Sequence, residues 1–113
     1  MPPDLTAMSP MGYMTFSMIE LRQTAQFSHW LRRLKDAEAA ARIVGRLRRM
    51  EQGNPGDSRS VGGGIMEMRI DYGPGYRVHY AHRGKEIVIL LCGGDKRNQA
   101  QDIKRAHALA EEY

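Results

Sequence analysis

The sequence predicts an α+β domain of two layers, in which a helical hairpin packs on a small, mostly antiparallel sheet. Three observations predict it. Apolar residues recur at helical spacing between residues 24 and 50, short strand-like segments joined by tight turns fill residues 65–92, and helical spacing returns after residue 98. The expected order is an N-terminal strand, a helical hairpin, a mostly antiparallel three-stranded segment and a short C-terminal helix. The chain of 113 residues is long enough for one such domain.

Residues 1–17 are rich in proline and methionine and show little periodicity, so we expect a disordered N-terminal extension before a single domain at 18–113. They carry no lysine or arginine ahead of an apolar stretch, which a secretory signal would need. The first strand is expected over Thr15–Leu21, where the residues alternate.

The hairpin begins after Thr24, a plausible N-cap, and its first helix presents Phe27, Trp30, Leu31 and Leu34 to the core. Asp36 and Glu38 suit the positive end of a second helix. That helix is expected to end at Gly53. The short connection predicts an antiparallel pair.

Three strands are expected at 65–71, 76–82 and 85–92, after a glycine-containing loop over 57–64. With residues 73–75 as the first turn, Asp71 would pair with Arg77, and Arg69 with His79. The run from Ile87 to Cys92 lacks polar alternation, which predicts a central strand covered on both faces. Asn98 and Gln101 resemble a capping box at the start of the last helix.

The strand segments place apolar residues at even positions and charged residues at odd ones, so one sheet face should be core and the other should carry a charged cluster. Arg69 and Arg77 on the charged face are candidates to bind phosphate or stabilise its transition state. Cross-strand pairing with Asp71 and Glu67 is an equally weighted alternative for each arginine alone. His79 is a candidate general acid or base, although a surface histidine is the simpler reading.

Lys96 and Arg97 follow the buried strand at the start of a helix, where cations gain nothing from the helix dipole, and this favours a functional role. The formal net charge is +4 and the pI about 9.5. Residues 22–49 hold eight Arg or Lys against two acidic residues. A solvated helix face would by itself explain that excess. The arginine-rich β-hairpin with Arg69 and Arg77 nevertheless favours an anionic partner, either nucleic acid or an acidic protein. Further candidates for RNA phosphate binding are Arg46, Arg49, Arg83 and Arg97.

No pair of histidines has metal-ligand spacing, and the single cysteine, Cys92, ends an apolar run. We therefore expect no metal or other cofactor, and a reduced core thiol in a cytoplasmic protein that does not enter a membrane. No serine or cysteine nucleophile with its base stands out. The residue patterns alone support a domain that binds RNA or phosphate, without naming a reaction.

Four segments resemble the RelE/ParE toxin superfamily, and most closely its HigB-like branch of addiction module killer proteins. They are residues 19–21, Gly-Asn-Pro-Gly-Asp at 53–57, Glu-Met-Arg-Ile at 67–70 with Tyr-Gly-Pro-Gly-Tyr-Arg-Val at 72–78, and Leu-Leu-Cys-Gly-Gly-Asp-Lys at 90–96. The resemblance implies the toxin of a type II toxin–antitoxin system. Many such toxins are metal-independent ribonucleases that cut mRNA on the ribosome.

Carried over by motif, Arg77 would stabilise the transition state, and Arg69 and Lys96 or Arg97 would supply further cations. Relatives often have a tyrosine near the final helix, whereas Ile103 or a neighbour stands here, so His79 is assigned the proton transfer. The implied partners are the ribosome with its mRNA and a helix-turn-helix antitoxin, through which the pair would bind operator DNA. A ParE-like toxin that poisons DNA gyrase, and a toxin-derived binding protein without activity, are the alternatives.

Overall fold

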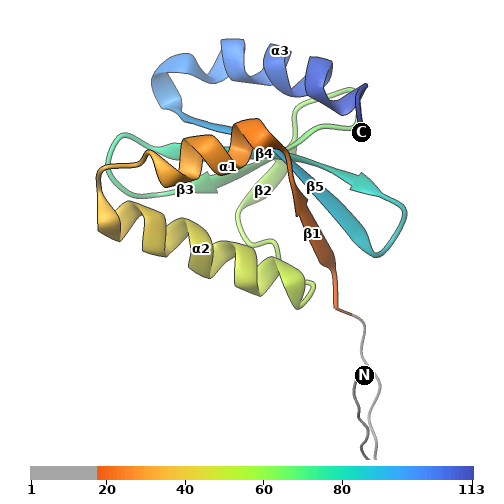
Figure 1. Cartoon of the computed structure of the whole chain (residues 1–113), viewed down its shortest axis with the longest axis horizontal. Coiled ribbons are helices and arrows are strands. Elements are labelled where there is room, and N and C mark those ends of the chain that lie inside the picture. Colours follow the sequence, from red (N-terminus) through yellow and green to blue (C-terminus); the bar gives the residue numbers. More distant parts are fainter. Residues whose placement is uncertain (1–17) are drawn as a thin grey trace, which may run out of the picture.

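A single five-stranded mixed sheet lies between helices on its two faces (Figure 1). The structure is a computed structural model that describes residues 18–113. In chain order its elements are β1 Glu20–Gln23, α1 Ala25–Arg32, α2 Ala37–Glu51, β2 Ser58–Ser60, β3 Met66–Ile70, β4 Tyr76–Arg83, β5 Ile87–Asp95, a 3-10 turn η1 Lys96–Asn98 and α3 Gln99–Ala110. The predicted α+β class and order of elements are confirmed. The extension expected at residues 1–17 lies outside the described residues.

The strands follow the order β1-β5-β4-β3-β2, with β1 parallel to β5 and the other neighbours antiparallel. Strand β5 is therefore internal, and its residues from Val88 to Cys92 are buried, as the unbroken apolar run predicts. The predicted first strand overlaps β1 only near its end, and its residues 15–17 lie outside the described part of the chain.

Both predicted helix starts in the hairpin are confirmed. The Thr24 hydroxyl accepts a hydrogen bond from the backbone of Phe27 at 3.0 Å and donates one to the Leu91 carbonyl at 2.6 Å, which fixes α1 to β5. The Asp36 carboxylate caps α2 by accepting from the backbone of Glu38 at 2.9 Å. These caps satisfy backbone donors that the first helical turn leaves free.

Two apolar cores lie on the two faces of the sheet. Helices α1 and α2 pack on one face, where the core is built on Phe27 and Ile43 from the helices and Met68, Val78 and Leu90 from the strands. Helix α3 packs on the other face over a smaller core (Ile65, Ala81, Ile89, Leu91, Cys92, Ala106, Leu109). The predicted core role of Cys92 is confirmed, and burial raises the pKa of its thiol to about 12.

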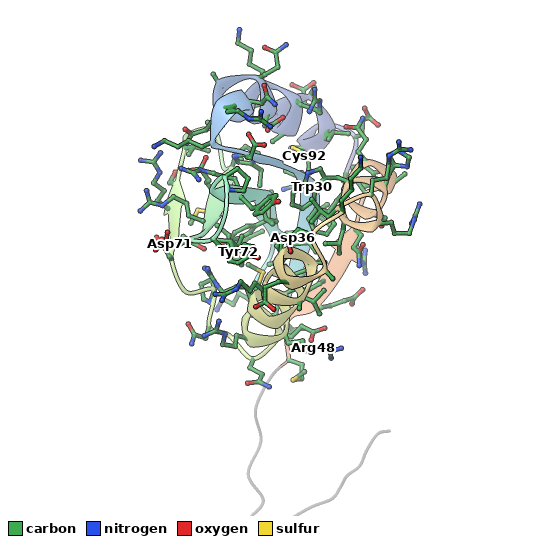
Figure 2. All side chains as sticks on the ribbon, turned by 90° about the vertical axis from the view of Figure 1, so that its left-hand side faces the viewer. Trp30, Asp36, Arg48, Asp71, Tyr72 and Cys92 are labelled. Carbon is green, nitrogen blue, oxygen red and sulfur yellow. The ribbon has the colours of Figure 1, made fainter. Side chains whose placement is uncertain are left out.

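The predicted pairing of the β3–β4 hairpin is wrong by two residues. Arg69 pairs with Arg77, and Glu67 pairs with His79, because residues 71–75 all belong to the turn. Within it, the Tyr72 hydroxyl donates to Asp36 at 3.0 Å and so joins the turn to the start of α2. Figure 2 labels both residues. A shift of two residues keeps every side chain on its predicted face and changes only its partner.

Three further details differ from the prediction. Residues 58–60, expected in a loop, form the edge strand β2. Strand β5 does not end at Cys92 but continues through Gly93 and Gly94 to Asp95. The predicted capping box is wrong, since Asn98 makes no side-chain cap bond, whereas Asp95 accepts from the backbone of Arg97 at 2.9 Å and caps η1.

Candidate functional site

A polar pocket of ≈ 430 Å³ lies beside the β3–β4 turn, where the ends of three segments meet. Arg69 and Arg77 come from the paired strands and Lys96 from η1. The remaining lining residues are Asp57, Ile70, Asp71, Gly73, Pro74 and Gly75. Three of the four predicted catalytic residues therefore line one pocket, and three cations at such short range suit an anionic ligand.

Arg77 is the most enclosed of these cations, with a side chain only 11% exposed. Its Nη1 donates to the Gly75 carbonyl at 2.8 Å, and its Nε lies 3.9 Å from the Glu67 carboxylate. Gly75 has a φ of +81°, and a Cβ there would lie 3.0 Å from Arg77 Nη1. The positive φ therefore favours glycine in this turn, and a side chain there would also crowd the Arg77 guanidinium.

The other pocket cations are more exposed. Arg69 has a side chain 43% exposed, and its Nη2 lies 3.4 Å from Asp57. Lys96 is exposed, and its Cβ would lie 3.6 Å from a Cβ placed on Gly75. Arg97 lies beside the pocket but pairs with Asp95 at 2.9 Å, and the hydrogen bond from Arg97 is the main cause that lowers the pKa of that carboxyl.

His79 does not line the pocket. Its side chain is fully buried, and its Nε2 lies 3.0 Å from Glu67 Oε2. Its Nδ1 has no hydrogen-bond partner within residues 18–113. A ligand in the pocket therefore cannot contact the imidazole directly, and any influence of His79 on that ligand must pass through Glu67 and Arg77.

Glu67 is the centre of a buried polar cluster between the sheet and α3. Its carboxylate accepts from the Gln99 amide at 2.8 and 3.0 Å and from Arg59 Nε at 3.3 Å, besides its contacts to His79 and Arg77. Burial raises the pKa of Glu67, but the hydrogen bonds from Gln99 and His79 outweigh burial and leave that pKa lowered. The ionised carboxylate thus holds the start of α3 against β3 and β4.

Because two adjacent residues of β5 are glycines, a side chain packs directly on the strand from each face of the sheet. A Cβ at Gly93 would overlap the Trp30 indole, and a Cβ at Gly94 would overlap the Asp102 carboxylate. Gly94 is directly opposite Arg77 of β4, so Asp102 packs on β5 beside the strand that carries Arg77. Burial raises the pKa of Asp102, while its 2.8 Å ion pair with Arg105 opposes that effect.

The remaining predicted phosphate ligands lie outside this pocket. Arg83, at the opposite end of β4, donates to the Ala110 and Tyr113 carbonyls at 2.7 and 3.1 Å and so caps the end of α3. Arg46 on α2 donates to the Arg69 carbonyl at 2.6 Å and to two further carbonyls of the 55–57 segment. Arg49 is exposed on α2, on the other side of the sheet.

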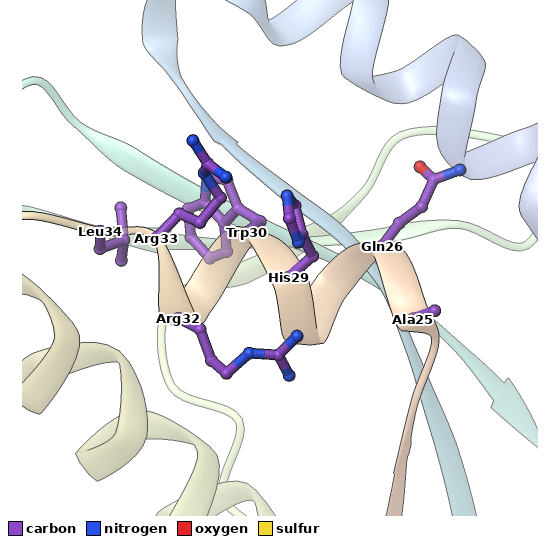
Figure 3. Close-up of a pocket in the computed structure, with 7 residues that line it drawn as sticks. All are labelled: Ala25, Gln26, His29, Trp30, Arg32, Arg33 and Leu34. Atoms are coloured by element: carbon purple, nitrogen blue, oxygen red, sulfur yellow. The ribbon is translucent and has the colours of Figure 1, made fainter.

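A second pocket of ≈ 690 Å³ lies along α1 and contains none of the predicted site residues. Figure 3 shows its lining, in which Trp30 and Leu34 are flanked by His29, Arg32 and Arg33. Trp30 is half-buried and contacts the rings of Phe27 and Tyr76, with centroids 5.7 and 6.3 Å away. Its main role is packing on β5, as the helical spacing predicts.

Sequence reasoning missed Arg59 and Gln99 as hydrogen-bond partners of Glu67, and the Tyr72–Asp36 contact that holds the turn. Arg59 lies on a strand too short to show alternation, and Gln99 reaches Glu67 only because α3 folds back over the sheet.

Within residues 18–113 no group of three or more His, Cys, Asp or Glu side chains is placed to hold a metal ion. No helix in that range combines the length and apolar character needed to cross a bilayer.

Comparison with known proteins places this architecture in a family. The sequence model of the family "Phage derived protein Gp49-like (DUF891)" matches residues 29–112, so the chain belongs to that Gp49-like family. An uncharacterized protein of Haemophilus influenzae (strain ATCC 51907 / DSM 11121 / KW20 / Rd) is 49% identical over 94 residues, which is 83% of this chain and 95% of the relative. The matched family region contains every residue of the pocket.

Proposed function

We propose that this chain is the toxin of a type II toxin–antitoxin system and a metal-independent endoribonuclease that cuts mRNA on the ribosome. The observation that carries the proposal is the meeting of Arg69, Arg77 and Lys96 in one polar pocket. The resemblance of the 72–78 and 90–96 segments to HigB-like toxins supports the same reaction. The proposed site of action places the protein in the cytoplasm.

In the proposed reaction the ribose 2′-oxygen attacks the adjacent phosphorus while the bond to the 5′-oxygen of the next nucleotide breaks. The 2′-hydroxyl gives up its proton and the leaving 5′-oxygen takes one up, so the products carry a 2′,3′-cyclic phosphate and a 5′-hydroxyl. Negative charge builds up on the phosphoryl oxygens in the transition state. Arg77, with Nη1 held by the Gly75 carbonyl, is preorganised to stabilise it, which is the effective form of electrostatic catalysis.

The proton transfers are assigned to groups that line the pocket. Asp57 and Asp71 are carboxylates in its wall, and the Lys96 ammonium is its most exposed cation. A carboxylate accepts the 2′ proton and Lys96 protonates the leaving oxygen. His79 becomes a positioning residue, because its buried imidazole contacts Glu67 and not the pocket.

The proposed partners follow from this function. The ribosome presents the mRNA, and a helix-turn-helix antitoxin neutralises the toxin and carries the complex to operator DNA. The basic pocket offers an acidic antitoxin segment the same cations that it offers RNA.

The test is induction of the chain in a bacterial host, followed by growth measurement and primer extension on abundant mRNAs. Wild type should stop growth and create new mRNA 5′ ends within minutes, whereas Arg77→Ala should do neither. Arg48→Ala, at an exposed position on α2 (Figure 2), is the matched control and should behave as wild type. If Arg77→Ala remains fully toxic and cuts mRNA, the role assigned to Arg77 is wrong.

Two other functions are favoured by the burial of His79, the residue to which the resemblance assigned the proton transfer. Gyrase poisoning and simple complex formation need no proton transfer. A ParE-like toxin would stop growth with intact mRNA and accumulated DNA breaks. A toxin-derived binding protein would not slow growth whether or not the antitoxin is present. The same induction experiment therefore separates the three functions.

A further inference from the structure

The part of the sheet that α3 leaves open carries a further cation, Arg59, on the edge strand β2. Arg59 is directly opposite Glu67, and Glu67 is directly opposite His79. Directly opposed side chains lie on the same face, so these three form a row across β2, β3 and β4. Arg69 and Arg77 form the neighbouring row on that face.

Among His79 and the three arginines of these two rows, exposure increases from β4 toward β2, although the Glu67 carboxylate on β3 is itself fully buried. The side chain of His79 is 0% exposed, that of Arg77 11%, that of Arg69 43% and that of Arg59 56%. Helix α3 packs mainly on β5 and β4, and Arg59 on β2 stays exposed. The cations therefore form an open path that begins in the pocket and ends at the sheet edge.

The buried Glu67 carboxylate holds the Arg59 guanidinium in place. Its Nε lies 3.3 Å from Glu67 Oε1, a carboxylate that is fully buried and also bound by Gln99. Within residues 18–113 the two terminal amino groups of Arg59 have no hydrogen-bond partner, and these are the groups that bind phosphate in a forked geometry. Because the buried carboxylate fixes the guanidinium through Nε, the two terminal amino groups of Arg59 are oriented to bind a phosphate.

We propose that Arg59 is a second phosphate subsite, which holds a nucleotide of single-stranded RNA beside the one whose phosphate occupies the Arg69–Arg77–Lys96 pocket. The proposal rests on the proposed function and adds the path of the substrate. Diagonal neighbours on adjacent strands are about 7–8 Å apart, whereas a stacked strand advances about 3.4 Å per nucleotide. Arg59 therefore contacts a phosphate one or two nucleotides away, and the RNA runs across β3 toward β2.

The test measures binding of 2′-O-methyl RNA, which lacks the attacking hydroxyl, over a series of salt concentrations. One ligand is an oligonucleotide of about eight nucleotides, and the other is a dinucleotide with a single phosphate, titrated by NMR. Arg59→Gln should reduce the slope of log K against log salt by about 0.7 for the longer RNA and leave dinucleotide binding unchanged. Arg69→Gln should weaken both ligands, and Arg48→Gln neither.

Arg59→Lys guards against a purely structural effect of the substitution. It keeps the charge and should retain the wild-type salt slope, while Arg59→Gln shows the reduced slope. The melting temperatures of both variants show whether either substitution disturbs the fold. If Arg59→Gln binds both RNAs as wild type does, the second subsite is overturned and the pocket stands. If wild type binds neither RNA, the second subsite is overturned, while the ribonuclease function is decided separately by cleavage of mRNA on ribosomes.

Discussion

The two faces of the sheet differ in how they are covered. The face under α1 and α2 is apolar throughout its core, whereas the face under α3 combines a smaller apolar core with the buried polar side chains of Glu67, His79 and Asp102. The first face is covered by two helices and the second by one. A single helix of 12 residues leaves part of a five-stranded sheet open, and the pocket lies in that open part.

This difference separates stability from function within one sheet. The larger apolar core lies under the helical hairpin, so burial there should contribute more to the free energy of folding than burial under α3, because the hydrophobic effect scales with the apolar area removed from water. On the α3 face, hydrogen bonds to Glu67 hold Arg59 and the start of α3. Arg77 is held by an ion pair with Glu67 and a hydrogen bond to the Gly75 carbonyl. Substitutions on the first face should therefore act on folding, and those on the open part of the second face on ligand binding.

The largest expected effect on stability is that of Phe27→Ala, at a fully buried position under α1. The loss of the ring and the cavity left behind should reduce the free energy of unfolding by about 3–5 kcal/mol. Urea denaturation followed by circular dichroism measures this change. A loss below about 1 kcal/mol would show that the hairpin face is not the main core.

A comparison of two arginines on the α3 face gives a smaller effect. Arg83→Gln removes hydrogen bonds to the Ala110 and Tyr113 carbonyls and should cost about 1 kcal/mol of stability, with RNA binding unchanged. Arg69→Gln, at the pocket, should weaken RNA binding with little change in stability. Thermal melting and RNA titration of both variants test this. If Arg83→Gln weakens RNA binding and Arg69→Gln does not, the ligand site lies at the other end of β4.

The smallest expected effects depend on pH and have opposite signs for two buried carboxyls. Hydrogen bonds leave the pKa of Glu67 below its ordinary value of 4.5, so its ionised form stabilises the fold above that pH. Glu67→Gln should thus be less stable than wild type at neutral pH, and the difference should vanish as the pH falls through the lowered pKa.

Asp102 should behave in the opposite way. Burial raises its pKa above the ordinary 3.8, so its ionised form costs stability above the raised pKa. Asp102→Asn should relieve that cost at neutral pH, and its advantage should disappear in acid. Urea midpoints over the acid range measure both variants, and a change of the same sign for both would contradict the two environments described for them.

The sequence predicts the faces of the hairpin strands but not their partners. Alternation at residues 66–70 and 76–80 is a local signal, and it places Met68 and Val78 in the core and Glu67 and His79 opposite them. The register depends on how many residues the turn takes up, which the Tyr72–Asp36 hydrogen bond helps to set across 36 residues of chain. That contact has no local signature.

The candidate site is predictable only in part for a similar reason. Arg69, Arg77 and Lys96 stand out by charge and strand position, and the structure brings them together. The burial of His79 follows from the placement of α3, which is a tertiary contact. The roles of Arg46 and Arg83 as donors to backbone carbonyls are likewise invisible in a sequence, because a positive charge does not reveal which acceptor it will meet.

The central claim is that the open pocket on the α3 face cuts RNA by attack of the 2′-oxygen. The most direct measurement is of the ends produced when the purified chain acts on mRNA bound to ribosomes. Wild type should leave a 5′-hydroxyl and a 2′,3′-cyclic phosphate, and Arg77→Ala should leave the mRNA intact. Uncut mRNA with the wild-type chain, or fragments with 5′-phosphate ends, would contradict the claim.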